Sequence, residues 1–365
     1  MKRRSFMKAA GVGLAAGAIA TPVKAEGLPE IKWRCASSFP KSSDTIYGAA
    51  EIVAKRVAEI TENKFQIRVF AGGEIVPALQ VLDAVQNATV ECGHTANYYY
   101  FGKDPTWAFD TAIPFGPNFR QQNAWMYYGG GLELMREFAK QHNIYTIPAG
   151  NTGTQMGGWF GKEINTVDDF KGLKMRIGGF AGQVISKLGA VPQQIAGGDI
   201  YPALEKGTID ATEWIGPYDD EKLGFYKVAK YYYYPGWWEG GPMLNFIVNT
   251  KTWESLPKEY QAAIDAACAE ANVLTMAKYD AQNPPALKRL VAAGAVLKRF
   301  PQPVIDASYK AAMEVFAETA EKNANFKKLW EAQKAFMADQ HLWFSVAEYS
   351  FDTFMYATAA TARKG

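Results

Sequence analysis

Patterns of apolar and polar side chains predict that the first folded elements are a strand, a helix and a second strand. Residues 30–37 and 64–70 alternate between apolar and polar side chains, which is typical of half-buried strands. Between them, residues 42–61 repeat apolar side chains such as Ile46 and Val53 at helical spacing. The order strand, helix, strand predicts a βαβ unit with a mostly parallel sheet, and therefore an α/β domain.

Two stretches of the chain resemble each other and hint at a second, similar domain. In residues 83–91 and again in residues 202–210, a short helical segment breaks at a small residue and an apolar-acidic strand follows. A chance similarity is the alternative. If this similarity reflects two similar domains, residues 97–100 and the pair Glu213-Trp214 lie at equivalent strand ends. Ligands of open α/β sheets bind at the carboxyl ends of strands, so both places are candidate positions for a site.

The C-terminal part of the chain follows a helical pattern. Ser255 and Pro257 are typical of a helix start, residues 262–278 continue that helix, and residues 304–323 and 326–360 predict two more. The last of these carries apolar and aromatic residues on one face and therefore needs a partner surface. It would either strap two domains together or pair with a second subunit.

The chain length and these patterns predict the domain organisation. The chain has 365 residues, more than one hydrophobic core usually serves, which favours two domains. The first α/β domain is expected at residues 26–150, completed by about 243–300. The second, dense in glycine and aromatic residues, is expected at residues 151–242. Residues 301–365 are expected to form C-terminal helices that dimerise.

Residues 1–25 have the three parts of an export signal. Lys2, Arg3 and Arg4 form a basic start, an apolar run follows over residues 9–20, and residues 23–25 have the small-x-small pattern of a cleavage site. The paired arginines resemble a twin-arginine signal. A membrane anchor is the alternative, but the apolar run is shorter than the ~20 residues that a spanning helix needs. The chain is therefore expected to be exported.

Removing this signal reverses the sign of the net charge. The full sequence has a formal net charge of +2, and residues 1–25 carry five basic and no acidic side chains, so +2 − 5 = −3 remains. No cluster of Lys and Arg in the rest resembles a phosphate-binding stripe, which argues against nucleic acid as a partner. Three cysteines, Cys35, Cys92 and Cys268, leave at least one thiol free, and the sequence does not decide whether the other two pair.

Arg176 is a candidate for binding a carboxylate. It lies in a predicted strand at residues 172–177, directly before Gly178 and Gly179. A charge in a buried strand is costly unless it is paired, and a planar guanidinium can clamp a carboxylate with two hydrogen bonds. A structural ion pair explains the same pattern equally well.

Glu213 and Glu239 are candidates for a cation site. Glu213 ends a predicted strand, and Glu239 lies in a loop rich in tryptophan and glycine. Oxygen ligands suit hard cations such as Na⁺ or Ca²⁺, although two exposed acids are the alternative. A monocarboxylate ligand, Arg176, Glu213 and Glu239 sum to −1 + 1 − 1 − 1 = −2, which disfavours the ligand unless a cation joins. Ca²⁺ would neutralise this set and Na⁺ would leave −1.

Two polar segments are candidates to complete such a site. Residues 150–155 form a glycine-rich loop after a predicted strand and end in Gln155, whose amide can contact a ligand. Tyr98, Tyr99 and Tyr100 follow a strand of the first domain and can provide hydroxyls and an apolar wall. An ordinary turn and packing in the core are the alternatives.

Motifs of common enzyme classes are missing from the sequence. It contains no Gly-x-Ser-x-Gly, no His-Glu-x-x-His and no phosphate-binding P-loop. An exported enzyme is the rival class of function. Its catalytic groups would be His94 beside Cys92, or the pair Glu213 and Glu239 as in a glycosidase.

Several of these stretches resemble the substrate-binding proteins of TRAP transporters, the DctP-like family. This likeness is carried by residues 176–182, 203–214 and 256–261. Four further segments are similar to the alpha-keto-acid receptors within that family: residues 150–155, 157–160, 213–222 and 231–241. The likeness covers essentially the whole chain after the signal.

The resemblance implies a fold, a place of action and partners. The fold would be α/β, a two-domain periplasmic-binding-protein clamshell (type II-like) with long C-terminal helices. It would close on a small organic anion in the periplasm and deliver it to TRAP membrane permease subunits. A homodimer through the helix at residues 326–360 is also implied. Such receptors are commonly exported unfolded, so the twin-arginine start leaves the export route open.

The resemblance also implies roles for the candidate residues. The ligand would be a pyruvate-like 2-oxo monocarboxylate, with lactate or another carboxylate as the alternative. Arg176 would bind its carboxylate, while the cation, Na⁺ or alternatively Ca²⁺, would be held by Gln155, Glu213, Glu239 and the backbone carbonyl of Trp214. Gln155 and Trp214 would also contact the substrate, and Tyr100 and Phe180 are candidates for the pocket wall.

Overall fold

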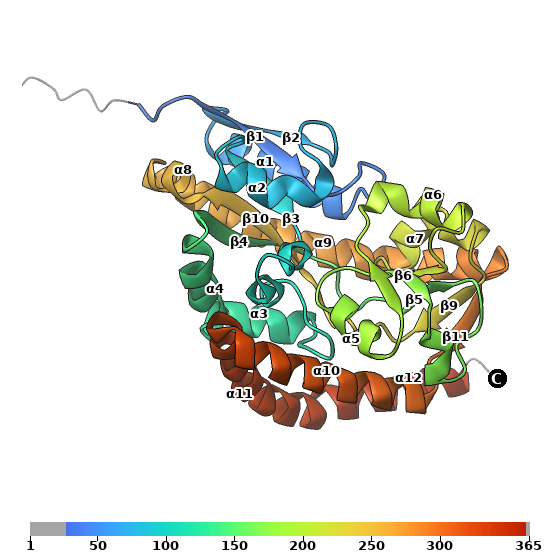
Figure 1. The fold of residues 1–365 in the computed structure, drawn as a ribbon. Helices are drawn as coiled ribbons and strands as arrows, with labels where there is room; N and C mark the ends of the chain where they lie inside the picture. Colours follow the sequence, from blue (N-terminus) through green and yellow to red (C-terminus); the bar gives the residue numbers. More distant parts are fainter. Residues whose placement is uncertain (1–26, 363–365) are drawn as a thin grey trace, which may run out of the picture.

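The computed structural model describes residues 27–362, which form two domains, each built around one β-sheet (Figure 1). The predicted export signal at residues 1–25 lies outside this range. Among the helices of residues 27–362, none combines the length and the apolar character needed to cross a membrane.

The first sheet has the strand order β2-β1-β3-β10-β4. Its strands are β1 (Ile31–Ser37), β2 (Phe65–Phe70), β3 (Cys92–Thr95), β4 (Ile144–Asn151) and β10 (Met243–Asn249). The helices of this domain are α1 (Ile46–Ile60), α2 (Val81–Gln86), α3 (Phe119–Tyr128), α4 (Gly131–Lys140) and α8 (Thr250–Glu254). β1 pairs in parallel with β2 and β3, so the predicted βαβ unit is confirmed. β10 runs antiparallel to both neighbours because the chain re-enters this sheet from the second domain.

The second sheet has the strand order β11-β9-β5-β8-β6-β7. Its strands are β5 (Gly158–Phe160), β6 (Lys174–Arg176), β7 (Val191–Gln193), β8 (Ala211–Thr212), β9 (Tyr231–Tyr234) and β11 (Val296–Arg299). The helices of this domain are α5 (Ala181–Lys187), α6 (Ile200–Glu205) and α7 (Pro217–Leu223). The two similar stretches adopt similar structures, since α2 leads to β3 and α6 leads to β8. β3 and β8 begin directly after the two similar stretches, which end at residues 91 and 210.

One predicted boundary is wrong. Residues 243–300 were expected to complete the first domain, but β11 pairs in parallel with β9 and belongs to the second sheet. The reason is α9 (Lys258–Ala292), which has 35 residues and is therefore about 50 Å long. It packs against α1 and β4 of the first domain and against α7 of the second, and so carries the chain from one to the other.

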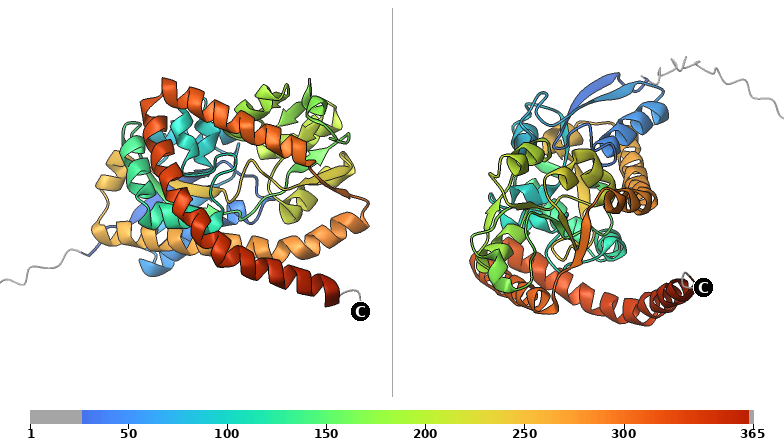
Figure 2. Two further views of the ribbon diagram at one scale, coloured as in Figure 1. Left: turned by 90° about the horizontal axis from the view of Figure 1, so that it is seen from below. Right: turned by 90° about the vertical axis from the view of Figure 1, so that its right-hand side faces the viewer.

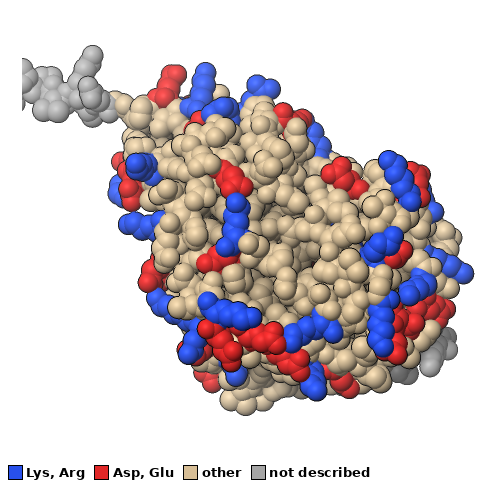
Figure 3. Space-filling view, in the orientation of Figure 1, with Lys and Arg blue, Asp and Glu red and all other residues tan. Residues whose placement is uncertain are grey.

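Three helices complete the chain: α10 (Gln302–Lys322), α11 (Ala324–Val346) and α12 (Glu348–Ala362). The helix expected over residues 326–360 is therefore divided at Ala347. α10 packs on α5 of the second domain, and α11 packs on α4 of the first. Figure 2 shows that α12 then extends past the body of the molecule. Acidic and basic side chains are interspersed on the face shown in Figure 3.

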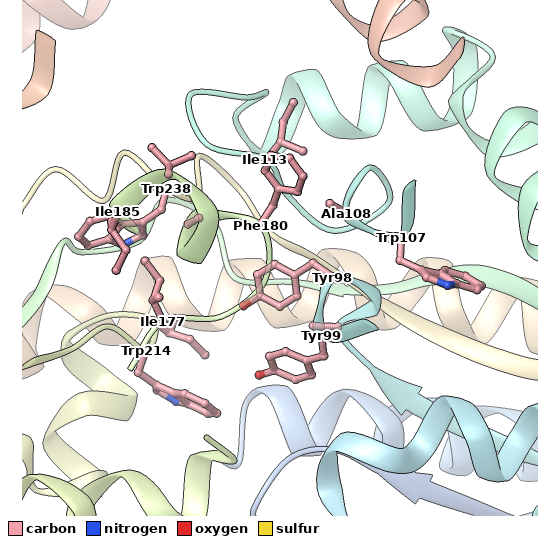
Figure 4. Close-up of a cluster of buried hydrophobic side chains, with 14 of the residues drawn as sticks. Tyr98, Tyr99, Trp107, Ala108, Ile113, Ile177, Phe180, Ile185, Trp214 and Trp238 are labelled. Carbon is pink, nitrogen blue, oxygen red and sulfur yellow. The ribbon is translucent and has the colours of Figure 1, made fainter. Parts of the chain in front are cut away.

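The two domains share one large core at their junction. It contains Tyr98 and Tyr99 from the first domain, and Ile177, Trp214 and Trp238 from the second domain and its connection (Figure 4). A second core lies between β1, α1 and α9 and includes the three cysteines, which are all buried and unpaired. The first core shows that the domains are closed on each other.

Candidate functional site

Arg176 is the last residue of β6, at the carboxyl edge of the second sheet. Its side chain is 1% exposed. Nε donates a hydrogen bond to the carbonyl of Ile195 (3.1 Å), and Nη1 donates to both the carbonyl and the carboxylate of Glu213. Nη2 has no partner. The guanidinium lies 4.9 Å from the ring centroid of Trp214, so its planar face is covered while the two N–H groups of Nη2 are left available.

Glu213 follows β8, the strand paired with β6, and this pairing brings it beside Arg176. Its Oε1 also accepts a hydrogen bond from the backbone N–H of Gly178 (2.7 Å), whereas its Oε2 has no partner. Burial raises the pKa of Glu213, and the charge of Arg176 opposes that shift. Arg176 and Glu213 therefore form the buried ion pair that the sequence left as an alternative, but each keeps one unused polar atom.

Glu239 comes from the connection between β9 and β10 and is 1% exposed. Neither of its carboxylate oxygens has a hydrogen-bond partner. Burial, and then repulsion from Glu213, raise the pKa of Glu239 well above its usual range. Tyr98 and Gln155 lie close enough to lower this pKa in part, without reaching hydrogen-bonding geometry. An ionised Glu239 is unstable here unless a positive group joins it.

Gln155 lies after β4, in the loop that enters the second domain. Its Nε2 donates a hydrogen bond to Oγ1 of Thr152 (3.2 Å), and its Oε1 has no partner. The unsatisfied acceptors thus come from three separate segments and belong to Gln155, Glu213 and Glu239.

Tyr98 and Tyr99 bring the first domain into the site. They lie in η2 (Asn97–Tyr100) after β3, and their rings stack with centroids 5.0 Å apart. Figure 4 shows both hydroxyls on the side of Ile177 and Trp214. Gly179 has a φ of +60°, and a Cβ there would lie 2.2 Å from the Tyr98 ring. Only glycine permits this close approach of the two domains.

Tyr100 and Phe180 were expected in the pocket wall, and the structure gives both other surroundings. The Tyr100 hydroxyl accepts a hydrogen bond from the N–H of Leu82 (3.1 Å) and lies 3.1 Å from Oγ1 of Thr95, inside the first domain. The Phe180 ring stacks on Phe326 at 5.4 Å, beneath the C-terminal helices. Consecutive residues of a 3₁₀-helix point in different directions, so of the three tyrosines it is Tyr98 and Tyr99 that face the site.

A small cavity of about 20 Å³ adjoins these groups. Tyr98, Tyr99, Gln155 and Trp214 line one part of it. The remaining lining residues are Phe39, Ile46, Ala96, Thr152, Ile215, Pro242 and Leu244. Several come from the carboxyl ends of β1 and β3, where open α/β sheets bind their ligands. Phe39, Ile46 and Leu244 could not be recognised as lining residues from the sequence, because an apolar residue has the same pattern whether it lines a site or fills the core.

The residues of the site fit a hard cation together with an anion. With both glutamates ionised, Arg176, Glu213 and Glu239 sum to +1 − 1 − 1 = −1, and all three are buried. The unused oxygens of Gln155, Glu213 and Glu239 are the ligands that Na⁺ and Ca²⁺ prefer. Within residues 27–362, no group of three or more His, Cys, Asp or Glu could hold a metal. A cation at this site therefore needs further oxygens, from the backbone or from its co-ligand.

His94 and Cys92 do not form a catalytic pair of the predicted kind. His94 is fully buried, and its Nε2 lies 3.0 Å from the carbonyl oxygen of Ala149. Burial lowers the pKa of His94 to about 4, which keeps the ring neutral. Cys92 is also buried, and burial raises the pKa of its thiol well above the usual value. Neither group faces the site between the domains.

Comparisons with known proteins agree with this geometry. The family model described as bacterial extracellular solute-binding protein, family 7, matches residues 36–323. A monocarboxylate 2-oxoacid-binding periplasmic protein of Nostoc sp. is 51% identical, over 97% of this chain and 99% of that protein.

Solved structures extend the comparison. A TRAP transporter solute-binding protein of Bordetella bronchiseptica is 54% identical, with a TM-score of 0.90 over 92% of this chain and 99% of its own; it is a mixed-occupancy dimer with calcium and picolinate in one active site. One from Pseudoalteromonas atlantica, with sodium and pyruvate, is 40% identical, with a TM-score of 0.86 over 88% of this chain and 98% of its own. One from Colwellia psychrerythraea, with calcium and pyruvate, is 38% identical, with a TM-score of 0.85 over the same shares.

The matched family consists of receptors that bind small organic anions for transport rather than enzymes. With buried polar groups that lack partners at the junction of two α/β domains and a family model that covers most of its length, this chain belongs to the bacterial extracellular solute-binding proteins of family 7, the receptors of TRAP transporters.

Proposed function

We propose that this receptor binds a short 2-oxo monocarboxylate such as pyruvate together with one Na⁺ or Ca²⁺. Arg176 binds the ligand carboxylate through Nη2. Glu213, Glu239, Gln155 and the backbone carbonyl of Trp214 hold the cation, which neutralises buried charge and contacts the carboxylate and oxo oxygens of the ligand.

One observation carries this proposal: an unused guanidinium N–H and four unused acceptor oxygens lie together in a fully buried site. Buried polar atoms without partners are rare in native proteins. A donor without a partner calls for an anion, and acceptors without partners call for a cation. A ligand with an oxygen next to its carboxylate can bridge the two.

The charges favour the same combination. With both glutamates ionised, a monocarboxylate brings the buried charge of the site from −1 to −2, and a cation returns it to −1 or 0. The Nostoc relative binds monocarboxylate 2-oxoacids, and the solved relatives contain pyruvate with sodium or calcium. The picolinate of the Bordetella protein also carries a second donor atom next to its carboxylate.

Calorimetric titration tests the proposal. The protein is freed of ligand by unfolding and refolding and is titrated with pyruvate, once in sodium buffer and once in chelated, sodium-free buffer. We expect one-to-one binding with a cation and at least about tenfold weaker binding without it; restoring Na⁺ or Ca²⁺ separately identifies the ion. Binding that is indifferent to both ions would contradict the cation site. Stronger binding of lactate than of pyruvate would assign the receptor to 2-hydroxy acids.

We also propose that α11 and α12 form a homodimer interface. Six apolar or aromatic residues of these helices are between 58% and 70% exposed: Leu342, Trp343, Val346, Tyr349, Phe351 and Phe354. Such a contiguous apolar surface usually marks an interface, and the Bordetella relative is a dimer. Trp343→Glu together with Phe354→Glu should convert a dimer to a monomer in light scattering. A wild-type monomer at micromolar concentration would contradict the interface.

The third part of the proposal is the place of action. Residues 1–25 direct export, and the receptor delivers its ligand to a TRAP permease from the periplasm. Cell fractionation should find the protein, shortened by its signal, in the periplasmic fraction. Deletion of its gene should abolish pyruvate uptake through that permease; unchanged uptake would favour a sensory role instead.

A further inference from the structure

We infer that apolar side chains of the first domain, above all Ile46 and Leu244, set the length of the ligand side chain that this receptor accepts. The inference rests on the proposed function and adds to it the residues that select among 2-oxo acids. It starts from the small cavity beside the charged groups.

The two sides of this cavity differ in chemistry. On the side of the second domain, Trp214 packs against the guanidinium of Arg176, and Gln155 lies beside Glu239. On the side of the first domain, Phe39 follows β1, Ile46 begins α1 and Ala96 follows β3. Leu244 of β10 closes the same side. No residue that lines the cavity is charged.

This division orients the ligand. Both members of the ion pair belong to the second domain, so the ligand carboxylate and its adjacent oxygen are held there. The rest of the ligand then extends toward the first domain, where the apolar side chains cover it as the domains close. A second carboxylate at that end would be buried without a positively charged partner, since none of the lining residues carries a charge, and this is strongly unfavourable. The cavity therefore selects monocarboxylates with an apolar side chain.

The apolar wall is fixed in place by its neighbours. A Cβ on Gly150 would lie 3.0 Å from the Leu244 side chain, so Leu244 is packed against the bare backbone of the adjacent strand β4. Phe39 packs edge-on against His94 at 5.5 Å and lies 6.4 Å from Tyr99. Ile46 is 1% exposed at the first turn of α1. Because these packed side chains cannot move away from the ligand, each methylene added to the ligand changes its binding affinity.

Truncating and filling this wall should change selectivity in opposite directions. The measurement is the ratio of Kd for 4-methyl-2-oxopentanoate to Kd for pyruvate, by calorimetry in the buffer that supports wild-type binding. Ile46→Ala should lower this ratio roughly tenfold, because a methylene in a pocket is worth about that much or more. Ala96→Val should raise the ratio by a similar factor. A matched control is Ile264→Ala, which truncates the same side chain in the core beneath α9, away from the cavity, and should leave the ratio unchanged.

The outcomes separate the inference from the function on which it rests. If the wild type binds pyruvate but neither Ile46→Ala nor Ala96→Val changes the ratio relative to the control, this inference is overturned and the proposed function stands. If the wild type binds no 2-oxo acid, the proposed function fails first. Should Ile46→Ala not fold, Ile46→Val decides the matter, with a smaller decrease in the ratio expected. Comparable binding of 2-oxoglutarate and pyruvate by the wild type would also overturn the inference.

Discussion

Arg176 has a structural contact as well as a free N–H, so its removal should affect folding and binding together. Arg176→Met leaves the Glu213 carboxylate buried without its counter-ion, and losing one partner of a buried pair costs about 3–5 kcal/mol of unfolding free energy. We expect pyruvate binding to be lost and the urea midpoint to fall.

A double variant separates the two effects. Replacing a whole buried ion pair by uncharged groups is often neutral for stability. Arg176→Met with Glu213→Gln should therefore recover most of the lost unfolding free energy while binding stays absent. Recovery of binding in the double variant would contradict the carboxylate-binding role of Arg176.

Glu239 should lower the unfolding free energy of the ligand-free protein but strengthen ligand binding. Its raised pKa means that the folded, ligand-free protein holds a proton that the unfolded chain releases near pH 4.3. Above that pH the unfolding free energy falls until Glu239 ionises in the folded state. Glu239→Gln removes this penalty.

We therefore expect Glu239→Gln, in chelated buffer, to melt at least about 2 °C above the wild type at pH 8, with a smaller difference at pH 5. Its pyruvate Kd in sodium should rise at least about tenfold, since the substitution removes the negative charge and replaces one of the two free oxygens by an NH₂ group that cannot bind a cation. Differential scanning calorimetry and titration measure the two effects. A lower melting temperature at pH 8 would mean that Glu239 already has a stabilising partner.

The sequence identified the charged residues of this site better than its apolar wall. Arg176 was a candidate because a charge within a buried strand is costly and calls for a partner, and Glu213 was a candidate because it follows a strand among aromatic residues. All three tyrosines were candidates and the family resemblance favoured Tyr100, but the direction of each ring depends on the 3₁₀ turn, which places Tyr98 and Tyr99 at the site. Ile46 and Leu244 gave no signal, since their role depends on how the two domains meet.

Among the elements, those with strong local patterns were predicted well. The strand expected over residues 64–70 is β2. The helix expected over residues 42–61 is α1, which begins later, at Ile46. α9 was expected to start near Ser255 but begins at Lys258, and it continues through Pro284 and Pro285 to Ala292. Prolines usually end a helix, and here contacts with α7 support the continuation, including a hydrogen bond from the Tyr218 N–H to Asn283 (3.0 Å).

α9 also supports α7 through a buried hydrogen bond that a single substitution tests. The Tyr279 hydroxyl donates to Oδ2 of Asp219 (2.7 Å), and the other oxygen of Asp219 has no partner. Tyr279→Phe leaves this buried carboxyl without a donor and should cost about 1–3 kcal/mol. Burial raises the pKa of Asp219 to about 6, so the loss should grow as the pH rises through that value. Urea unfolding at pH 5 and pH 8 measures it.

A matched control lies on the same helix. The Tyr260 hydroxyl donates to the carbonyl of Pro29 at the same distance of 2.7 Å, near the surface. Tyr260→Phe should cost about 0.5–1.5 kcal/mol because the acceptor is neutral, with no change between the two pH values. Equal losses in both variants at both pH values would contradict the role given to Asp219.

For the whole molecule, Asp44 links the two domains at the surface. It precedes α1 in the first domain and forms ion pairs with Lys222 of α7 and with Nζ of Lys278 in α9 (2.9 Å). The Tyr218 hydroxyl of α7 also donates to it (3.3 Å). Burial raises the pKa of Asp44, but the hydrogen bonds from both lysines outweigh this and leave the pKa below its usual value. The ionised form therefore favours the closed arrangement.

Asp44→Asn should shift the molecule toward an open arrangement and weaken ligand binding without altering the site. Half-exposed ion pairs contribute about 0.2–1 kcal/mol each. The apparent Kd is inversely proportional to the fraction of molecules that remain closed, so we expect a pyruvate Kd about twofold to tenfold higher. Small-angle scattering of the ligand-free variant should give a larger radius of gyration. Glu74→Gln is the matched control, because Glu74 pairs with Lys41 at similar exposure but within the first domain. Equal effects of the two substitutions on Kd would show that Asp44 does not act through closure. An effect confined to Asp44→Asn, together with a weaker pyruvate affinity of the wild type at high salt, would identify these surface charges as a determinant of affinity.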